Sequence, residues 1–272
     1  MAKEGRIGVF DSGIGGLTVL REVRTLLPGE ETIYLGDTAR VPYGTKSGEA
    51  VIRYSLEVAG FMKGKGIKML VVACNTASAY ALPALKEALD VPVVGVIEPG
   101  AATAAEATMA KRIGVIGTEA TIKSGAYFDA IKAIDSKTAV YMKACPLFVP
   151  LAEEGWLDND VTRLTAESYL ANFKKEEIDI LVLGCTHYPL LKPLIAGVMG
   201  KGVTLIDSAR ATAAEVKRIL QEKGLVRDAD PAFPAAPPEF FVTDSPERFA
   251  TVGKRFFGDG LVSAELVRLG DS

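Results

Sequence analysis

The order of apolar and amphipathic segments most constrains the fold of this chain of 272 residues. Short, nearly continuous apolar runs alternate with longer segments in which apolar residues recur at helical spacing. The first three pairs of run and helix are residues 7–10 and 17–27, 32–35 and 49–63, and 69–73 and 77–88. Further apolar runs, each followed by a helical stretch, occupy residues 93–96, 113–116, 180–183 and 204–206. Apolar strands between helices predict an α/β fold with parallel sheets that are buried on both faces.

The chain also resembles itself. Residues 67–74 (IKMLVVAC) match residues 178–185 (IDILVLGC), and residues 6–9 (RIGV) match residues 112–115 (RIGV) at nearly the same offset. Apolar strands can look alike by chance, but two matches at nearly one offset favour two related halves. We therefore expect two pseudo-symmetric domains, each a mostly parallel sheet flanked by helices.

The last part of the chain is too short to form a domain of its own. It contains a helical segment at 209–223, a loop rich in Pro and Ala at 231–238, a short apolar run at 240–243 and a final helix. We expect this tail to return to the first half. The predicted division is a discontinuous domain 1, residues 1–98 and 208–272, and a continuous domain 2, residues 99–207.

Composition excludes several classes of protein. A hydrophobic fraction of 49% and a charged fraction of 24% are typical of globular proteins and not of disordered chains. The net charge is −3, and the Lys and Arg residues are scattered, so we expect no direct contact with nucleic acid. No apolar run approaches the roughly 18 residues of a membrane span, and the first residues lack a signal-peptide core, so we expect a cytoplasmic protein without membrane contact.

The three cysteines do not form a disulfide framework, because their number is odd and a reducing compartment favours free thiols. Cys74 and Cys185 occupy equivalent positions in the two matching segments, each after an apolar strand and before a predicted helix. Each cysteine therefore lies at the carboxyl end of a strand, which is where open α/β sheets bind ligands. A helix N-terminus there favours both a thiolate and a bound carboxylate. Cys145 has no symmetric partner, and we interpret it as structural.

Two thiols that flank one cleft suit the inversion of a carbon centre, because one base removes a proton from one face while an acid delivers a proton to the other. Each cysteine alone could be a small buried hydrophobic residue, but the repeated position argues against that reading. Asp11 and Ser12, on a glycine-rich turn after the first strand, and His187, near Cys185, are further candidates. His187 could instead be structural, and no further ligand has the spacing of a metal site.

The glycine-rich segment 11–16 also raises the alternative of dinucleotide binding, with Asp37 as the acid that binds ribose. Thr18 stands where the third glycine of that fingerprint belongs, and the chain has no Gly-Lys-Ser/Thr run for a P-loop. On their own, Glu153, Glu154 and the turn at 42–44 could equally be ordinary loop residues.

Five segments taken together resemble the glutamate racemases, a cofactor-independent family of the aspartate/glutamate racemase superfamily. They are residues 10–17 (FDSGIGGL), 41–44 (VPYG), 73–77 (ACNTA), 145–151 (CPLFVPL) with Glu153, and 184–189 (GCTHYP). The resemblance extends to about residue 258 and covers nearly the whole chain. It implies an active site in a cleft between the two domains and interconversion of L- and D-glutamate without cofactor or metal. The D-glutamate would supply peptidoglycan synthesis.

The resemblance also implies roles for individual residues. Cys74 would deprotonate D-glutamate with the assistance of Asp11, and Cys185 would deprotonate L-glutamate with the assistance of His187 and Glu153. The implied substrate contacts are Asp11, Ser12, Pro42, Tyr43, Gly44, Asn75, Thr76, Thr118, Thr186 and His187.

Partners follow from the same resemblance: a small-molecule substrate and a homodimer. Members of the family dimerise in more than one arrangement, and some respond to cell-wall precursors or bind DNA gyrase, so those partners stay open for this chain. Three alternative functions also stay open. An aspartate racemase or related isomerase would use the same cysteine pair, and an amidase or thioesterase would need one nucleophilic cysteine. A non-catalytic two-domain protein that binds a small anion would need neither.

Overall fold

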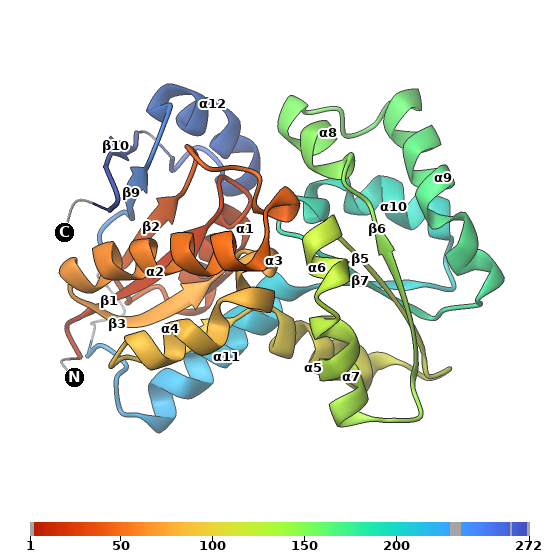
Figure 1. Ribbon diagram of the computed structural model, residues 1–272, viewed down its shortest axis with the longest axis horizontal. Coiled ribbons are helices and arrows are strands. Elements are labelled where there is room, and N and C mark those ends of the chain that lie inside the picture. The colour runs from red at the N-terminus through yellow and green to blue at the C-terminus, as the bar shows by residue number, and fades with distance from the viewer. Residues whose placement is uncertain (1–2, 229–234, 262, 271–272) are drawn as a thin grey trace.

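The computed structural model describes residues 3–228, 235–261 and 263–270, so the loop predicted at 231–238 lies partly outside the described residues. The chain forms two lobes, each built on its own parallel sheet with helices packed around it (Figure 1). This arrangement confirms the predicted α/β class with two sheets. None of the described helices has the length and apolar character of a membrane span.

The larger sheet combines strands from both ends of the sequence. Its strand order is β10(Glu265–Leu266), β9(Glu239–Val242), β2(Thr32–Gly36), β1(Arg6–Asp11), β3(Ile67–Val72) and β4(Val93–Gly95), and all neighbouring pairs are parallel. We call the part of the molecule built on it the six-stranded lobe. The presence of β9 and β10 in this sheet supports the proposed discontinuous domain 1.

The smaller sheet comes from the middle of the sequence. Its order is β6(Ala139–Ala144), β5(Arg112–Gly117), β7(Ile180–Gly184) and β8(Thr204–Asp207), again with parallel pairs throughout. We call this part the four-stranded lobe. The matching segments of the sequence form corresponding strands, since β1 and β5 start from the repeated Arg-Ile-Gly-Val, and β3 and β7 lead into Cys74 and Cys185.

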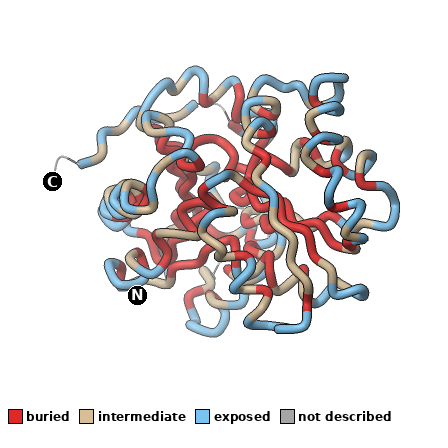
Figure 2. The backbone as a smooth tube through the Cα atoms, turned by 45° about the vertical axis from the view of Figure 1, so that its right-hand side comes forward, coloured by how far each residue is buried: buried red, intermediate tan, exposed pale blue. Residues whose placement is uncertain are grey.

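Helices pack on both faces of each sheet because alternate strand residues point to opposite faces. In the six-stranded lobe, Ile7 and Val9 of β1 pack in one core cluster with α1(Leu17–Leu26), α11(Ser208–Glu222) and α12(Pro246–Phe257). On the other face, Phe10 packs in a second cluster with α2(Gly48–Gly64), α3(Asn75–Tyr80) and α4(Leu82–Ala88). The buried residues are accordingly concentrated in the strands, while the outer faces of helices and the loops are exposed (Figure 2).

The four-stranded lobe repeats this arrangement. One face of its sheet packs on α5(Ile97–Ala107) and α7(Ala126–Ile134), and the other on α8(Phe148–Glu154), α9(Asp160–Lys175) and α10(Lys192–Met199). The short helix α6(Glu119–Lys123) follows β5, and two 3-10 turns, η1(Tyr43–Thr45) and η2(Tyr188–Leu191), lie near strand ends.

Two local details differ from the sequence interpretation. The helical segment 77–88 is divided between α3 and α4, with Pro83 in the first turn of α4, where its missing N–H removes no intrahelical bond. Cys185 does not stand at a helix N-terminus, because η2 begins three residues later at Tyr188 and α10 only at Lys192. The helix argument therefore holds for Cys74 alone.

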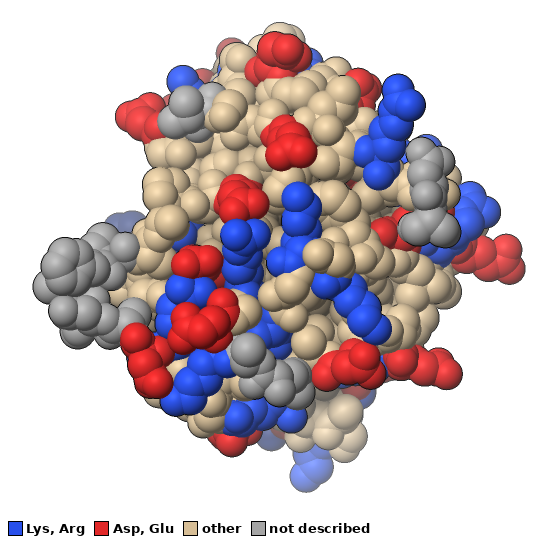
Figure 3. Space-filling view, turned by 90° about the vertical axis from the view of Figure 1, so that its left-hand side faces the viewer, with Lys and Arg blue, Asp and Glu red and all other residues tan. Residues whose placement is uncertain are grey.

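On the face shown in Figure 3, Lys and Arg side chains gather in the middle, with Asp and Glu side chains lying among and around them. This mixture of charges differs from the continuous basic stripe of a surface that binds a phosphate backbone.

Candidate active site

A pocket lies between the carboxyl edges of the two sheets. Its volume is about 440 Å³ including the space open to solvent. All the residues proposed from the sequence as catalytic or substrate-binding line it, except Asp11. The lining consists of Ser12, Gly13, Val41, Pro42, Tyr43, Gly44, Cys74, Asn75, Thr76, Thr118, Val149, Glu153, Cys185, Thr186 and His187. The sequence interpretation had missed Gly13, Val41 and Val149, whose small or apolar side chains carry no chemical signal.

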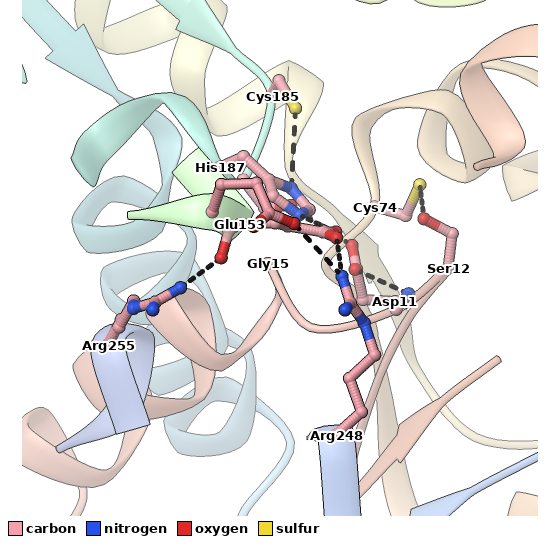
Figure 4. A network of polar contacts seen from close by, with 12 residues as sticks. Asp11, Ser12, Gly15, Cys74, Glu153, Cys185, His187, Arg248 and Arg255 are labelled. Carbon is pink, nitrogen blue, oxygen red and sulfur yellow. Dashed lines mark hydrogen bonds and ion pairs between the residues drawn. The ribbon is translucent and has the colours of Figure 1, made fainter. Parts of the chain in front are cut away.

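Cys74 lies at the end of β3 and caps helix α3. Its Sγ accepts a hydrogen bond from Ala77 N at 3.5 Å and lies 3.7 Å from Ser12 Oγ (Figure 4). Burial and, to a smaller extent, the nearby Asp11 carboxyl raise the pKa of the Cys74 thiol to about 12, against the lowering effect of the Ala77 N–H. Cys74 is therefore a thiol at neutral pH and can act as a proton donor.

Asp11 lies behind the lining of the pocket and is almost fully buried. Its carboxyl accepts hydrogen bonds from Gly13 N at 2.9 Å and from Thr186 Oγ1 at 3.4 Å. Burial raises the pKa of Asp11, against the positive charge of His187. Asp11 thus joins the turn that carries Ser12 to the turn that carries Cys185.

Cys185 lies at the end of β7 and has a different partner from Cys74. Its Sγ is 3.9 Å from His187 Nδ1, and His187 Nε2 is 3.0 Å from Glu153 Oε1 (Figure 4). Burial lowers the pKa of His187, but the hydrogen bonds to Cys185 and Glu153 outweigh it and raise the pKa to about 10. The imidazolium therefore places a positive charge next to one of the two thiols.

His187 is the single histidine of the chain, so its titration can be followed directly. In the protein labelled with ¹³C- or ¹⁵N-histidine, we expect the imidazole NMR signals to titrate with a midpoint near 10, against 6.5 for an ordinary histidine. Because the pKa is raised on folding, the stability contributed by the imidazolium is fully present below pH 6.5 and is lost as the pH rises through about 10. The same signals in urea, with the chain unfolded, serve as the control. A folded-state midpoint at or below that of the unfolded chain would show that burial keeps His187 neutral.

Asn75 and Thr76, polar lining residues of α3, contact the four-stranded lobe. Asn75 Oδ1 accepts a hydrogen bond from the Tyr127 hydroxyl of α7 at 2.7 Å, and Thr76 Oγ1 lies 3.0 Å from Thr118 Oγ1. The buried Asn75 Nδ2 has no hydrogen-bond partner among the described residues. Since a buried amide without a partner is costly, this N–H₂ group is available to a ligand in the pocket. The sequence had given no sign of Tyr127, which acts through Asn75.

Two glycines permit this close approach of the lobes. A Cβ at Gly15 would lie 2.5 Å from His187 Nδ1, and a Cβ at Gly44 would lie 2.6 Å from Thr118 Cβ. Both distances are shorter than any side chain tolerates without displacement. Within the glycine-rich segment after β1, Gly15 therefore has a role in the contact between the lobes.

Asp37 does not provide the free carboxylate that a dinucleotide site would need. It is fully buried, and its carboxylate accepts hydrogen bonds from the Tyr43 hydroxyl at 2.5 Å and from Thr243 Oγ1 at 2.8 Å, and pairs with Arg40 Nε at 2.7 Å. The hydrogen bond to Asp37 orients Tyr43 at the pocket wall. Within the described residues, no group of three or more His, Cys, Asp and Glu side chains has the arrangement of a metal site.

Comparison with known proteins agrees with this geometry. The sequence matches the family Asp/Glu/Hydantoin racemase over residues 7–216. It is 58% identical over 255 residues to a glutamate racemase of Geobacter metallireducens, covering 94% of this chain and 93% of that protein. The structure superposes on a glutamate racemase isoform from Bacillus anthracis with a TM-score of 0.93 at 42% identity, and on the Francisella tularensis glutamate racemase in complex with D-glutamate with a TM-score of 0.90 at 37% identity, covering 98% of each chain in both cases. A match that spans most of the chain, with two cysteines facing one pocket between two parallel sheets, shows that this chain belongs to the Asp/Glu/Hydantoin racemase family.

Proposed function

We propose that this chain is a glutamate racemase that interconverts L- and D-glutamate by proton transfer between the α-carbon and two thiols. The observation that carries the proposal is the placement of Cys74 and Cys185 at equivalent ends of β3 and β7, on the lining of one pocket. Each thiol has its own polar neighbours, so two thiols are available for proton transfer. A mechanism with a single nucleophile would need only one of them. The relatives named glutamate racemase support glutamate as the substrate.

In the direction from L- to D-glutamate, the Cys185 thiolate takes the α-proton from one face of the substrate. The Cys74 thiol, whose pKa is raised by burial, then gives its proton to the opposite face. The product leaves Cys185 as a thiol and Cys74 as a thiolate, which is the state that accepts a proton from D-glutamate. The reverse reaction follows the same steps in the opposite order, and the imidazolium of His187 compensates the negative charge when it is on Cys185.

The α-proton of an amino acid is far less acidic than a thiol. In a reaction without pyridoxal phosphate the protein itself must stabilise the charge that develops on the substrate carboxylate. The donors at the pocket include the Asn75 amide and the hydroxyl groups of Ser12, Thr76, Thr118 and Thr186. A narrow pocket between two lobes in contact also limits water, which strengthens these interactions.

The biological role belongs to the same proposal. D-glutamate made by this chain would supply peptidoglycan synthesis in the cytoplasm, and the active form would be a homodimer that contacts neither membrane nor nucleic acid. The peptidoglycan role and the homodimer rest on the resemblance of the sequence motifs to the family. The cytoplasmic location and the lack of contact with membrane or nucleic acid rest on the composition and charge of the chain.

The test is incubation of the purified protein with L-glutamate in deuterium oxide without added cofactor. We expect the circular dichroism of the amino acid to decay to zero, and the α-proton NMR signal to disappear as solvent deuterium enters the product enantiomer. A parallel incubation with L-aspartate distinguishes a glutamate from an aspartate racemase. If neither inversion nor exchange occurs with either amino acid, the racemase proposal is wrong and a hydrolase or binding protein takes its place.

A further inference from the structure

Two arginines of the six-stranded lobe reach across to Glu153 of the four-stranded lobe. Arg248 Nη2 lies 3.4 Å from Glu153 Oε2, and Arg255 Nη1 donates a hydrogen bond to the backbone carbonyl of Glu153 (Figure 4). Both arginines belong to α12 and are two helical turns apart, so they lie on the same face of that helix. A single helix therefore holds Glu153 by its side chain and by its backbone.

Arg255 also completes the end of helix α8. The last carbonyls of a helix have no partner within the helix and carry a partial negative charge. α8 has no basic residue of its own in its last turn, so the guanidinium of Arg255 supplies the missing cation and donor. Gly155, which ends α8 with a φ of 76°, lies directly against this group: a Cβ there would be 3.0 Å from Arg255 Cζ.

The same helix α12 contacts His187. The ring of Phe256 meets the imidazole edge to face, with centroids 5.2 Å apart and an interplanar angle of 75°. Phe256 is fully buried, and its carbonyl accepts a hydrogen bond from Arg21 Nη1 at 3.0 Å, so the ring has a fixed place. α12 therefore touches both groups that lead to Cys185, namely Glu153 and His187.

We propose that α12 is a positioning element for the Cys185 half of the site, in which Arg248 and Arg255 fix Glu153 so that Glu153 holds His187 against Cys185. This inference rests on the proposed racemase function. Among the described residues, no side chain of α12 forms a hydrogen bond or ion pair with Cys74, Ser12 or Asp11. Loss of the arginines should therefore slow proton transfer at Cys185 and leave proton transfer at Cys74 largely as it is.

Charge and exposure support a positioning role over a purely structural one. Burial raises the pKa of Glu153, but the hydrogen bond to His187 and the charges of His187 and Arg248 outweigh it and keep that pKa below its usual value. The Arg248 side chain is 58% exposed, and ion pairs at such exposure contribute little to folding. Removing Arg248 should therefore disturb the positions of the Glu153 carboxylate and of His187 more than it lowers the free energy of unfolding.

The test compares Arg248→Met, Arg255→Met and the double variant with wild type, and uses Arg248→Lys for rescue. Lys254→Met is the matched control, since Lys254 lies on the same helix and is exposed, and its side chain forms no hydrogen bond or ion pair with the described residues. Racemisation is measured in both directions with α-protiated and α-deuterated glutamate. We expect turnover by the double variant to fall roughly ten- to hundredfold, Arg248→Lys to exceed Arg248→Met, and Lys254→Met to match wild type.

The isotope effects distinguish a positioning role of the arginines from a purely structural one. The first step from L-glutamate uses Cys185 and the first step from D-glutamate uses Cys74, so the substrate isotope effect should rise in the L-to-D direction and fall in the D-to-L direction. Wild-type turnover and isotope effects in the double variant, or a loss of turnover with the isotope effects unchanged, would overturn the inference. If the double variant does not fold, Arg248→Met decides the result because its side chain is largely exposed. A wild-type protein that does not racemise glutamate would instead refute the proposed function.

Discussion

Serine in place of either Cys74 or Cys185 should lower the rate of racemisation by at least about a thousandfold and leave the fold intact. An alcohol is a much weaker acid than a thiol, so the altered position neither takes nor delivers the proton at a useful rate. Serine has nearly the shape of cysteine, and both positions border the pocket, so the thermal unfolding midpoint should change little. The measurement is racemisation by circular dichroism, with thermal unfolding as the check on folding.

Solvent exchange distinguishes the two variants. In deuterium oxide, Cys185→Ser should exchange the α-proton of D-glutamate through Cys74 without inverting it, and should leave L-glutamate unchanged. Cys74→Ser should show the opposite preference. Cys145→Ala is the control, because Cys145 is buried in the core of the four-stranded lobe and does not line the pocket. Inversion at an undiminished rate in either serine variant, or its loss in Cys145→Ala, would exclude the two-thiol mechanism.

The largest effect on stability is expected at a buried ion pair that does not line the pocket. Lys68 Nζ lies 2.6 Å from Glu30 Oε2, and the two side chains are 1% and 2% exposed. Lys68 also donates hydrogen bonds to the carbonyls of Lys3 at 2.6 Å and Leu225 at 2.8 Å, and so connects β3 to the N-terminal segment and to the segment that follows α11. Lys68→Met should lower the free energy of unfolding by about 3–5 kcal/mol, because it leaves the Glu30 carboxylate buried without its cation.

Urea unfolding at neutral pH, followed by far-UV circular dichroism, measures this loss. Lys63→Met provides the control: Lys63 pairs with Asp90 at 3.2 Å, but the two side chains are 60% and 91% exposed, so a much smaller loss is expected. Equal unfolding midpoints for Lys68→Met and Lys63→Met would show that burial of the Lys68 pair adds nothing to stability.

The fold was largely predictable because eight of its strands carry an obvious signal. β1 to β5 and β7 to β9 come from the apolar runs of the sequence, and most of their side chains are buried against helices. β6 was not among these runs, because it is an edge strand whose residues are only partly buried. β10 had no such signal: it consists of Glu265 and Leu266, both exposed, and its place at the edge of the sheet depends on the return of the tail. A two-residue edge strand has too few residues to show a period.

From the strand pattern alone, the candidate site was predictable only where a residue lies next to a strand end, and residues such as Tyr43 and Glu153 came from the resemblance of the motifs. Cys74, Cys185, Ser12 and His187 follow strands directly, so the strand pattern locates them at the pocket. Tyr127, Arg248 and Arg255 lie on amphipathic helices and act through Asn75 or Glu153, from positions 52, 95 and 102 residues away in the sequence. Nothing in a single sequence links such pairs, because the packing of the two lobes creates them.

Thermodynamics limits the effect that the unequal surroundings of the two thiols can have on the reaction. L- and D-glutamate have the same free energy in water, so the equilibrium constant between them is unity, and kcat/KM must be the same in both directions. The imidazolium beside Cys185 and the buried carboxyl behind Cys74 therefore give neither enantiomer an advantage at equilibrium. They decide only how each direction divides between kcat and KM, and hence how the protein responds to the enantiomer that is more abundant around it.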